Sequence, residues 1–120
     1  MNLTAAEIKA FVPTRDLDLS VRFYEALGFE AASRMEDLAY MRHGETSFLL
    51  QLFDDARFSS NFMMHFLVEN VDDWHAFVQG EGIAEHFDVQ VGPLVDQPWR
   101  MRDFKLLDPF GVLWIIAQNT

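Results

Sequence analysis

The second half of the chain repeats the sequence pattern of the first half. A shift of 54 residues superimposes helix-cap residues, apolar residues and glycines, namely Asn70 on Asp16, Asp72 on Asp18, Phe77 on Phe23, Gly82 on Gly28 and Ile83 on Phe29. The last segment of each half repeats at a shift of 67 residues, which places Gly111 on Gly44 and Gln118 on Gln51. Matches that keep the same order along the chain indicate an internal duplication of one structural unit.

The first unit, over residues 1–53, is predicted to contain a strand, a helix and three further strands. The segment IKAFVPT (8–14) alternates its apolar residues as a strand does. Asp16 and Asp18 are typical helix-capping carboxylates, and Gly28 stands where the helix is expected to end. The three strands are then expected at about 29–35, 38–42 and 46–53. The predicted order of elements is therefore βαβββ.

The second unit, over residues 62–119, is predicted to have the same order, with the polar stretch DDARFSSN (54–61) as the linker. A strand FMMHFLVE precedes a helix VDDWHAFVQGEG, and three strands are expected in HFDVQV (86–91), RMRDFKLL and VLWIIAQ. The predicted fold is thus α+β, a single domain over residues 1–120 made of two tandem βαβββ modules. We expect an open, curved mixed sheet with the helices outside and a concave, trough-like face as the pocket.

The composition excludes some classes of binding partner. With 120 residues, half of them hydrophobic, the chain is long enough to bury a core. A formal net charge of −10 repels the phosphates of nucleic acids and anionic membranes, so neither is an expected partner. No apolar run approaches the roughly 20 residues of a membrane span, and the start of the chain lacks the pattern of a signal peptide. Cysteine is absent. We therefore expect a cytoplasmic protein.

Three segments carry a resemblance to a known family: VPTRDLDLSVRFYEALGF (12–29), HFLVENVDDWHAF (65–77) and LLDPFGVLWIIAQN (106–119). They resemble the glyoxalase / bleomycin-resistance / extradiol-dioxygenase superfamily, also called the vicinal oxygen chelate fold. Within it the chain is most similar to the bleomycin-resistance proteins. These share a Pro-Ser/Thr-Arg-Asp strand exit, as at residues 13–16, and a tryptophan nine residues before the Asp-Pro turn, here Trp99 before Asp108.

The resemblance implies that enzymes of the superfamily hold a divalent metal with His, Gln or Glu side chains from four strands. Carried over by motif spacing, these positions fall on Lys9, Phe48, Met63 and Ile115. None of the four is a carboxylate or an imidazole, and aliphatic groups do not coordinate such ions. We therefore expect no metal, no other cofactor and no catalytic residue. An enzyme with an atypical site, a glyoxalase-like lyase or isomerase or a dioxygenase relative, is the alternative interpretation.

The side chains expected to face the trough are Lys9, Phe11, Phe48, Leu50, Met63, His65, Leu67, Leu113, Ile115 and Ala117. They suit an apolar or aromatic, partly planar ligand, or they pack against one another in a closed core; the sequence leaves both interpretations open. His65 is a core-edge histidine, a ligand contact or a general base. Lys9 either extends to the mouth of the trough or pairs with a carboxylate.

Trp99 follows the turn-rich loop VGPLVDQP, and loops carry binding residues more often than strands do. The corresponding tryptophan of the bleomycin-resistance proteins lines their drug-binding cleft, so the resemblance implies that Trp99 contacts a ligand. The predicted ligand-binding residues are Trp99, Lys9, Phe11, Phe48, Leu50, Met63, His65 and Ile115. The resemblance also implies a homodimer whose clefts are completed across the subunit interface.

The expected function is metal-independent sequestration of an aromatic or glycopeptide-like, bleomycin-type antibiotic in a hydrophobic cleft. Besides the enzyme with an atypical site, a third interpretation is a non-catalytic domain whose ligand is a metabolite or has been lost.

Overall fold

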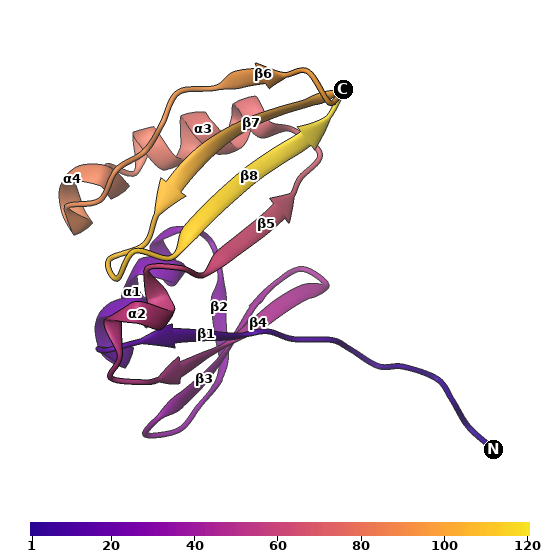
Figure 1. Ribbon diagram of the computed structural model, residues 1–120, viewed down its shortest axis with the longest axis vertical. Coiled ribbons are helices and arrows are strands. Elements are labelled where there is room, and N and C mark those ends of the chain that lie inside the picture. Colours follow the sequence, from indigo (N-terminus) through magenta and orange to yellow (C-terminus); the bar gives the residue numbers. More distant parts are fainter.

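The computed structural model describes residues 1–120 and contains two similar halves (Figure 1). The first half consists of β1 (Phe11–Thr14), α1 (Leu17–Ala26), β2 (Glu30–Arg34), β3 (Leu38–His43) and β4 (Thr46–Leu52). After the short helix α2 (Ala56–Ser59), the second half consists of β5 (Met63–Leu67), α3 (Val71–Gly80), α4 (Ile83–Phe87), β6 (Val95–Gln97), β7 (Met101–Leu107) and β8 (Leu113–Asn119). Both halves show the expected βαβββ order, and the second contains the additional helix α4.

Helix α1 begins and ends at residues that favour those positions. The Asp16 side chain accepts a hydrogen bond of 3.1 Å from the backbone N–H of Leu19 and caps the helix. One side of the helix is buried through Leu17, Ser20, Val21, Phe23 and Tyr24. Gly28 follows the helix with φ +107°, a conformation that residues with a Cβ rarely adopt.

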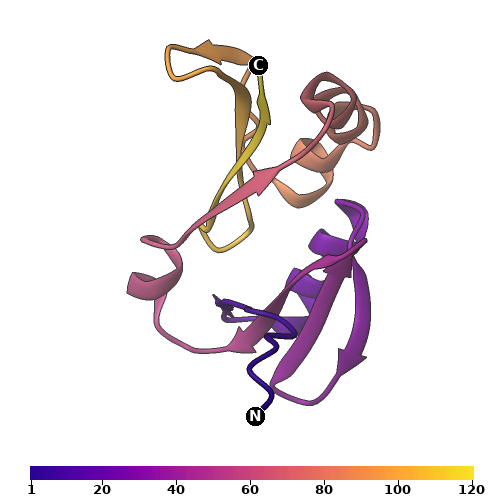
Figure 2. The same ribbon diagram turned by 90° about the vertical axis from the view of Figure 1, so that its right-hand side faces the viewer.

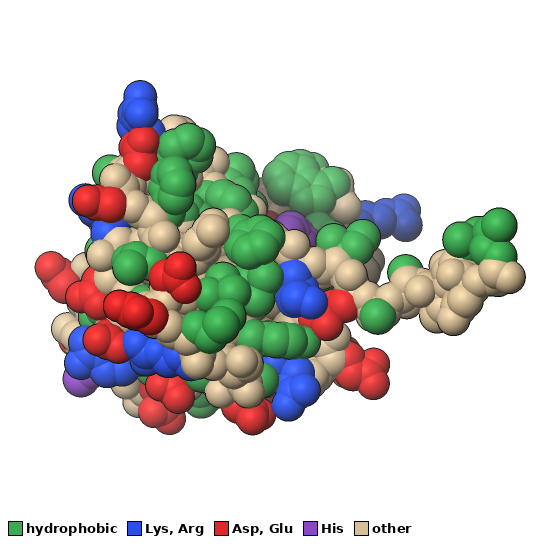
Figure 3. Space-filling view, turned by 90° about the horizontal axis from the view of Figure 1, so that it is seen from below, with side chains coloured by type: hydrophobic (Ala, Val, Ile, Leu, Met, Phe, Trp, Pro, Cys, Tyr) green, Lys and Arg blue, Asp and Glu red, His purple; other side chains and the backbone are tan.

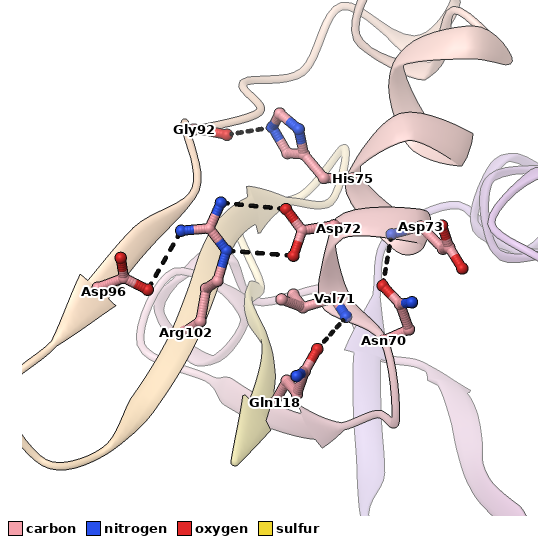
Figure 4. Close-up of polar contacts among 9 residues, drawn as sticks. All are labelled: Asn70, Val71, Asp72, Asp73, His75, Gly92, Asp96, Arg102 and Gln118. Carbon is pink, nitrogen blue, oxygen red and sulfur yellow. Dashed lines mark hydrogen bonds and ion pairs between the residues drawn. The ribbon is translucent and has the colours of Figure 1, made fainter. Parts of the chain in front are cut away.

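Helix α3 is capped in the same way, and its first turn is tied to the last strand (Figure 4). Asn70 Oδ1 accepts a hydrogen bond of 3.0 Å from the backbone N–H of Asp73. The backbone N–H of Val71 donates a bond of 2.8 Å to Gln118 Oε1 on β8. Like α1, this helix has ten residues, and no helix of the chain is long and apolar enough to cross a membrane.

The segment HFDVQV (86–91) does not form the strand that we expected. Its first two residues belong to α4, and Val91 makes only an isolated β-bridge. The helix forms because Ile83 and Phe87, four residues apart, both turn inward. Ile83 is buried, and the ring of Phe87 packs edge to face on that of Phe23, with centroids 5.2 Å apart. The strand that completes the second sheet, β6, comes later in the chain.

Each module forms its own four-stranded mixed sheet, with the orders β1-β4-β3-β2 and β5-β8-β7-β6. Strand β1 runs parallel to β4, and β5 runs parallel to β8. Strand pairing stops at the module boundary, so the expected open, curved surface consists of two separate sheets. Figure 2 shows α3 and α4 on one side of the second sheet. The α+β class, with mixed sheets that do not close, is confirmed.

The helix-covered faces of the two sheets share one hydrophobic core. Phe48 of β4 packs against Trp114 of β8 with ring centroids 5.3 Å apart, and Phe29 lies 5.5 Å from Phe66. A single cluster of 20 buried residues includes members of both modules. Because this core lies between the modules, the other face of each sheet is turned away from it.

Residues 1–10 form an extended arm before β1 that leaves the body of the molecule (Figures 1 and 3). The carbonyl of Ala10 accepts a hydrogen bond of 2.9 Å from the backbone N–H of Leu49, which holds the end of the arm beside β4. Met1, Leu3 and Ile8 are exposed. The arm therefore leaves three large apolar side chains in contact with solvent.

Candidate ligand-binding site

The face of each sheet that is turned away from the shared core is called the open face below. On the second sheet this face carries Met63, His65, Leu67, Leu113 and Ile115, with the exposed Lys105 of β7 paired beside Ile115. Met63 is 60% exposed and Leu67 is 52% exposed, whereas Phe66, which points to the opposite face, is buried. The strand register places His65 directly beside Ile115. These five residues, which we expected to share a face, therefore do share one, whereas Ala117 of the same predicted set is fully buried.

On the first sheet the open face carries Phe11, Tyr40, Ser47, Leu49 and Gln51. The expectation that Phe48 and Leu50 lie on this face is wrong. Phe48 is 1% exposed, and its ring lies 5.0 Å from that of Tyr24 in α1. Leu50 is fully buried in the same core. Both residues therefore stabilise the fold from the helix side, and Leu49 stands on the open face between them.

The error comes from two turns of different length. In the first module the pair His43 and Thr46 encloses two residues, whereas in the second module the corresponding pair, Asp108 and Val112, encloses three. The structural shift between the last strands is therefore 66 residues, which matches Leu49 to Ile115. Because side chains alternate along a strand, a shift that is wrong by one residue moves every side chain to the other face.

Lys9 and the end of the arm form a polar cluster on the open face of the first sheet. The Lys9 ammonium lies 3.3 Å from Glu7 Oε2 and 5.2 Å from the centroid of the Tyr40 ring. The Tyr40 hydroxyl donates a bond of 2.8 Å to Glu7 Oε1, and the Ser47 hydroxyl donates to the same carboxylate. These bonds lower the pKa of the Glu7 carboxyl below its usual value. Of the two interpretations of Lys9, pairing with a carboxylate is the observed one.

Trp99 lies in the exposed turn that joins β6 to β7. Its side chain is 62% exposed, and the next residue, Arg100, has φ +61°. The turn follows directly on Gln97 of β6, whose side-chain amide donates a bond of 3.0 Å to Asp103. The structure places Trp99 at the end of the second sheet and Phe11 on the first sheet, so one chain does not enclose the predicted ligand-binding residues in a closed cavity.

An aromatic cavity next to Phe11 was not predicted from the sequence. It encloses about 240 Å³, and its walls are Phe11, Pro13, Gln51, Phe53, Phe58 and Phe62. The rings of Phe53 and Phe58 pack edge to face with centroids 5.1 Å apart, and both side chains are exposed. The signal for this cavity was the cluster of phenylalanines in and around the linker, which we interpreted only as a polar connection.

Two titratable groups in the core, Tyr24 and Asp108, have raised pKa values. Burial raises the pKa of the Asp108 carboxyl, although the Tyr24 hydroxyl and backbone N–H groups donate to it. Burial, together with the nearby Asp108 carboxylate, raises the pKa of Tyr24 well above its usual value. Tyr24 is therefore a hydroxyl donor at neutral pH. The pair joins the modules and is separated from the surface where a ligand is expected.

Two βαβββ modules that share one core and expose the opposite sheet faces define a paired-module fold. The chain belongs to the Glyoxalase/Bleomycin resistance protein/Dioxygenase superfamily, whose family model matches residues 6–116. The resemblance found in the three sequence segments is thereby confirmed. A search among curated protein sequences found no significant match.

Several solved structures superimpose on nearly the whole chain. The bleomycin resistance determinant encoded on transposon Tn5 has a TM-score of 0.80 and 21% identity, covering 97% of this chain and 98% of its own. The bleomycin-binding protein from bleomycin-producing Streptomyces verticillus, complexed with copper(II)-bleomycin, reaches 0.82 with 19% identity over 100% of both chains. A lactoylglutathione lyase from Agrobacterium tumefaciens reaches 0.71 with 18% identity, covering 98% and 96%. At these identities the likeness shows the fold alone.

The residues present do not fit the divalent metal that the superfamily implies for its enzymes. With the corrected register the four strand positions are Lys9, Leu49, Met63 and Ile115. They offer one ammonium, one thioether and two aliphatic side chains, whereas such ions take carboxylate, amide or imidazole ligands. No group of three or more His, Asp or Glu side chains in the chain is arranged to hold an ion.

Proposed function

We propose that the protein binds an aromatic or glycopeptide-like compound of the bleomycin type on its open faces and releases it unchanged. The observation that carries the proposal is the exposure of large apolar side chains: Met63, Leu67 and Phe11 on these faces, and Trp99 in the turn at the end of the second sheet. An apolar surface of this kind, rimmed by polar groups, marks a binding site in many soluble proteins. Sequestration of a drug in this way would give antibiotic resistance.

The chemistry of the faces supports an aromatic ligand. The Trp99 indole and the phenyl ring of Phe11 offer flat surfaces for stacking, which stabilises aromatic pairs beyond the area that they bury. His65 and Lys105, which pair with Ile115 from opposite sides, offer polar groups that can orient a ligand through hydrogen bonds. Relatives of the same fold with solved structures include a bleomycin-binding protein complexed with bleomycin.

The proposal includes a homodimer. One chain leaves both open faces in solvent, so a second copy is needed to cover them and to enclose a ligand on more than one side. The exposed apolar side chains of the arm and of the open faces are consistent with burial against a partner. We propose that each cleft lies between the first sheet of one protomer and the second sheet of the other.

A fluorescence titration tests the proposal. Bleomycin and smaller flat heteroaromatic compounds are added to the wild-type protein and to a Trp99→Ala variant, and tryptophan emission is followed. Saturable quenching in the wild type that is lost in the variant supports the proposed site. Absence of quenching by all compounds, or equal quenching in the variant, contradicts it.

A further inference from the structure

A groove lies between the two modules, where the start of α3 approaches the β3–β4 hairpin. Two adjoining cavities of about 410 Å³ and 560 Å³ share His43, Asp73 and Trp74 in their walls and so form one groove. It meets the open face of the second sheet only at Leu67. Figure 2 shows the helices of the second module above the first module on this side. The volume of each cavity lies within the range of small-molecule sites in proteins, roughly 300–1,000 Å³.

The wall of the groove is aromatic. The Trp74 ring lies with its centroid 5.2 Å from that of His43, 5.1 Å from that of Phe66 and 6.1 Å from that of Phe77. All four rings line the groove. Phe77 and part of Trp74 are accessible to solvent, so this wall offers ring surface to an apolar body.

His43 supplies a hydrogen-bond acceptor in the same wall. Its Nδ1 lies 2.8 Å from the carbonyl oxygen of Gly28, and because a carbonyl only accepts, Nδ1 carries the proton. In the neutral ring Nε2 is then an acceptor, and it has no hydrogen-bond partner within the chain. Gly28 lies at the same end of the groove, and a Cβ on it would stand 3.8 Å from both the His43 and the Trp74 ring.

The rim of the groove is acidic. Glu45, Glu69 and Asp73 line it and are exposed, and none of their carboxylates takes part in an ion pair or a side-chain hydrogen bond of the chain. No lysine or arginine lines either cavity. The formal net charge of −10 adds to the negative potential of this groove.

We propose that this groove binds a small organic cation with an apolar body, such as a protonated aromatic amine. The ammonium group lies at the acidic rim, within reach of His43 Nε2, and the apolar body lies on the rings of Trp74 and Phe77. Carboxylates and aromatic faces both attract a cation, and burial of the apolar part of the ligand against the aromatic wall stabilises the complex further. The site does not include Trp99, and it shares only Leu67 with the open faces.

Calorimetric titration with three probes of one shape tests this site: 1-naphthylmethylammonium, the neutral 1-naphthylmethanol and the anionic 1-naphthylacetate. We expect the cation to bind once per chain and at least about tenfold more tightly than the alcohol. Asp73→Asn and Glu69→Gln each weaken binding of the cation by about two- to fivefold, as expected for exposed charge pairs. Glu36→Gln, which removes an exposed charge outside the groove, is the matched control and leaves the affinity unchanged.

The same titration on Trp99→Ala separates this inference from the proposed function. Unchanged binding of the cation by that variant supports an independent groove. Equal affinity for cation and alcohol, an effect of Glu36→Gln as large as that of Asp73→Asn, or loss of binding in Trp99→Ala overturns the inference.

Discussion

The hydroxyl of Tyr24 donates a hydrogen bond of 2.7 Å to Asp108 Oδ2 and so joins the helix of the first module to the last turn of the second. Trp114 Nε1 donates to the Tyr24 oxygen at 2.8 Å. Asp108 Oδ1 accepts from the backbone N–H groups of Phe110 and Val112. This buried series of bonds connects α1, the final turn and β8, and it stabilises the arrangement in which both open faces point away from the core.

Replacing Tyr24 with phenylalanine is therefore expected to destabilise the protein. The change removes the partner of Asp108 Oδ2 and of the Trp114 N–H, which costs about 1–3 kcal/mol for such a buried group. Urea unfolding followed by circular dichroism measures the loss. Tyr40→Phe is the control, since its hydroxyl bonds to Glu7 on an exposed arm, and it should cost less than about 1 kcal/mol. Equal losses for the two variants would argue against the role given to Tyr24.

The raised pKa of Asp108 predicts a pH dependence of stability with a defined sign. Between the usual carboxyl pKa of 3.8 and the raised value, the folded state binds more protons than the unfolded state. This group therefore adds stability as the pH falls through that window, and the addition is lost as the pH rises again. Asp108→Asn lacks the effect.

The free energy of unfolding is measured for both proteins at pH 7 and near pH 4. We expect the variant to fall further behind the wild type at the lower pH. Taking the difference removes the contribution of Glu7, Asp55 and Asp72, whose lowered pKa values act in the opposite direction. A gap that narrows on acidification would refute the prediction.

The corrected register of β4 predicts different effects for two neighbouring residues. Phe48→Ala removes a fully buried ring and is expected to lower the free energy of unfolding by about 3–5 kcal/mol. Leu49→Ala, on the open face, is expected to cost only about 1 kcal/mol. Thermal unfolding of the two variants distinguishes the faces. If Leu49→Ala were instead the less stable variant, the shift of 67 residues, which places Phe48 on the open face, would be correct.

Exposure of the open faces predicts self-association. Analytical ultracentrifugation at micromolar concentration should give twice the chain mass of 13.9 kDa. Met63→Glu places a charge on a side chain that is already 60% exposed in one chain, so it should fold normally and shift the equilibrium toward monomer. His86→Glu, in an exposed position of α4, is the control and should remain dimeric. A monomeric wild-type protein would contradict the dimer proposal.

The fold was largely predictable because its signals are local. The capping residues Asp16 and Asn70 and the alternation around Val12 and Phe66 mark each module through short-range chemistry. The face of Phe48 was not predictable in the same way, because it depends on the length of a turn that glycine matching conceals.

Features that depend on contacts between distant segments were missed. The helix at Ile83–Phe87 forms because it packs on α1, and a short apolar stretch does not show in sequence whether it is helical or extended. The groove around His43 and Trp74 brings together a hairpin and a helix from different modules. Neither arrangement leaves a periodic pattern in the sequence.

The most direct test of ligand binding on the open faces uses two neighbouring methionines. Met63 lies on the open face of β5, and Met64 points to the opposite face and packs against the core. In NMR spectra of protein labelled with ¹³C at the methionine methyl groups, addition of bleomycin should shift the Met63 signal in a saturable way and leave the Met64 signal in place. An unchanged Met63 signal at saturating bleomycin and saturating flat heteroaromatic compounds, or a shift of Met64 alone, would contradict the account.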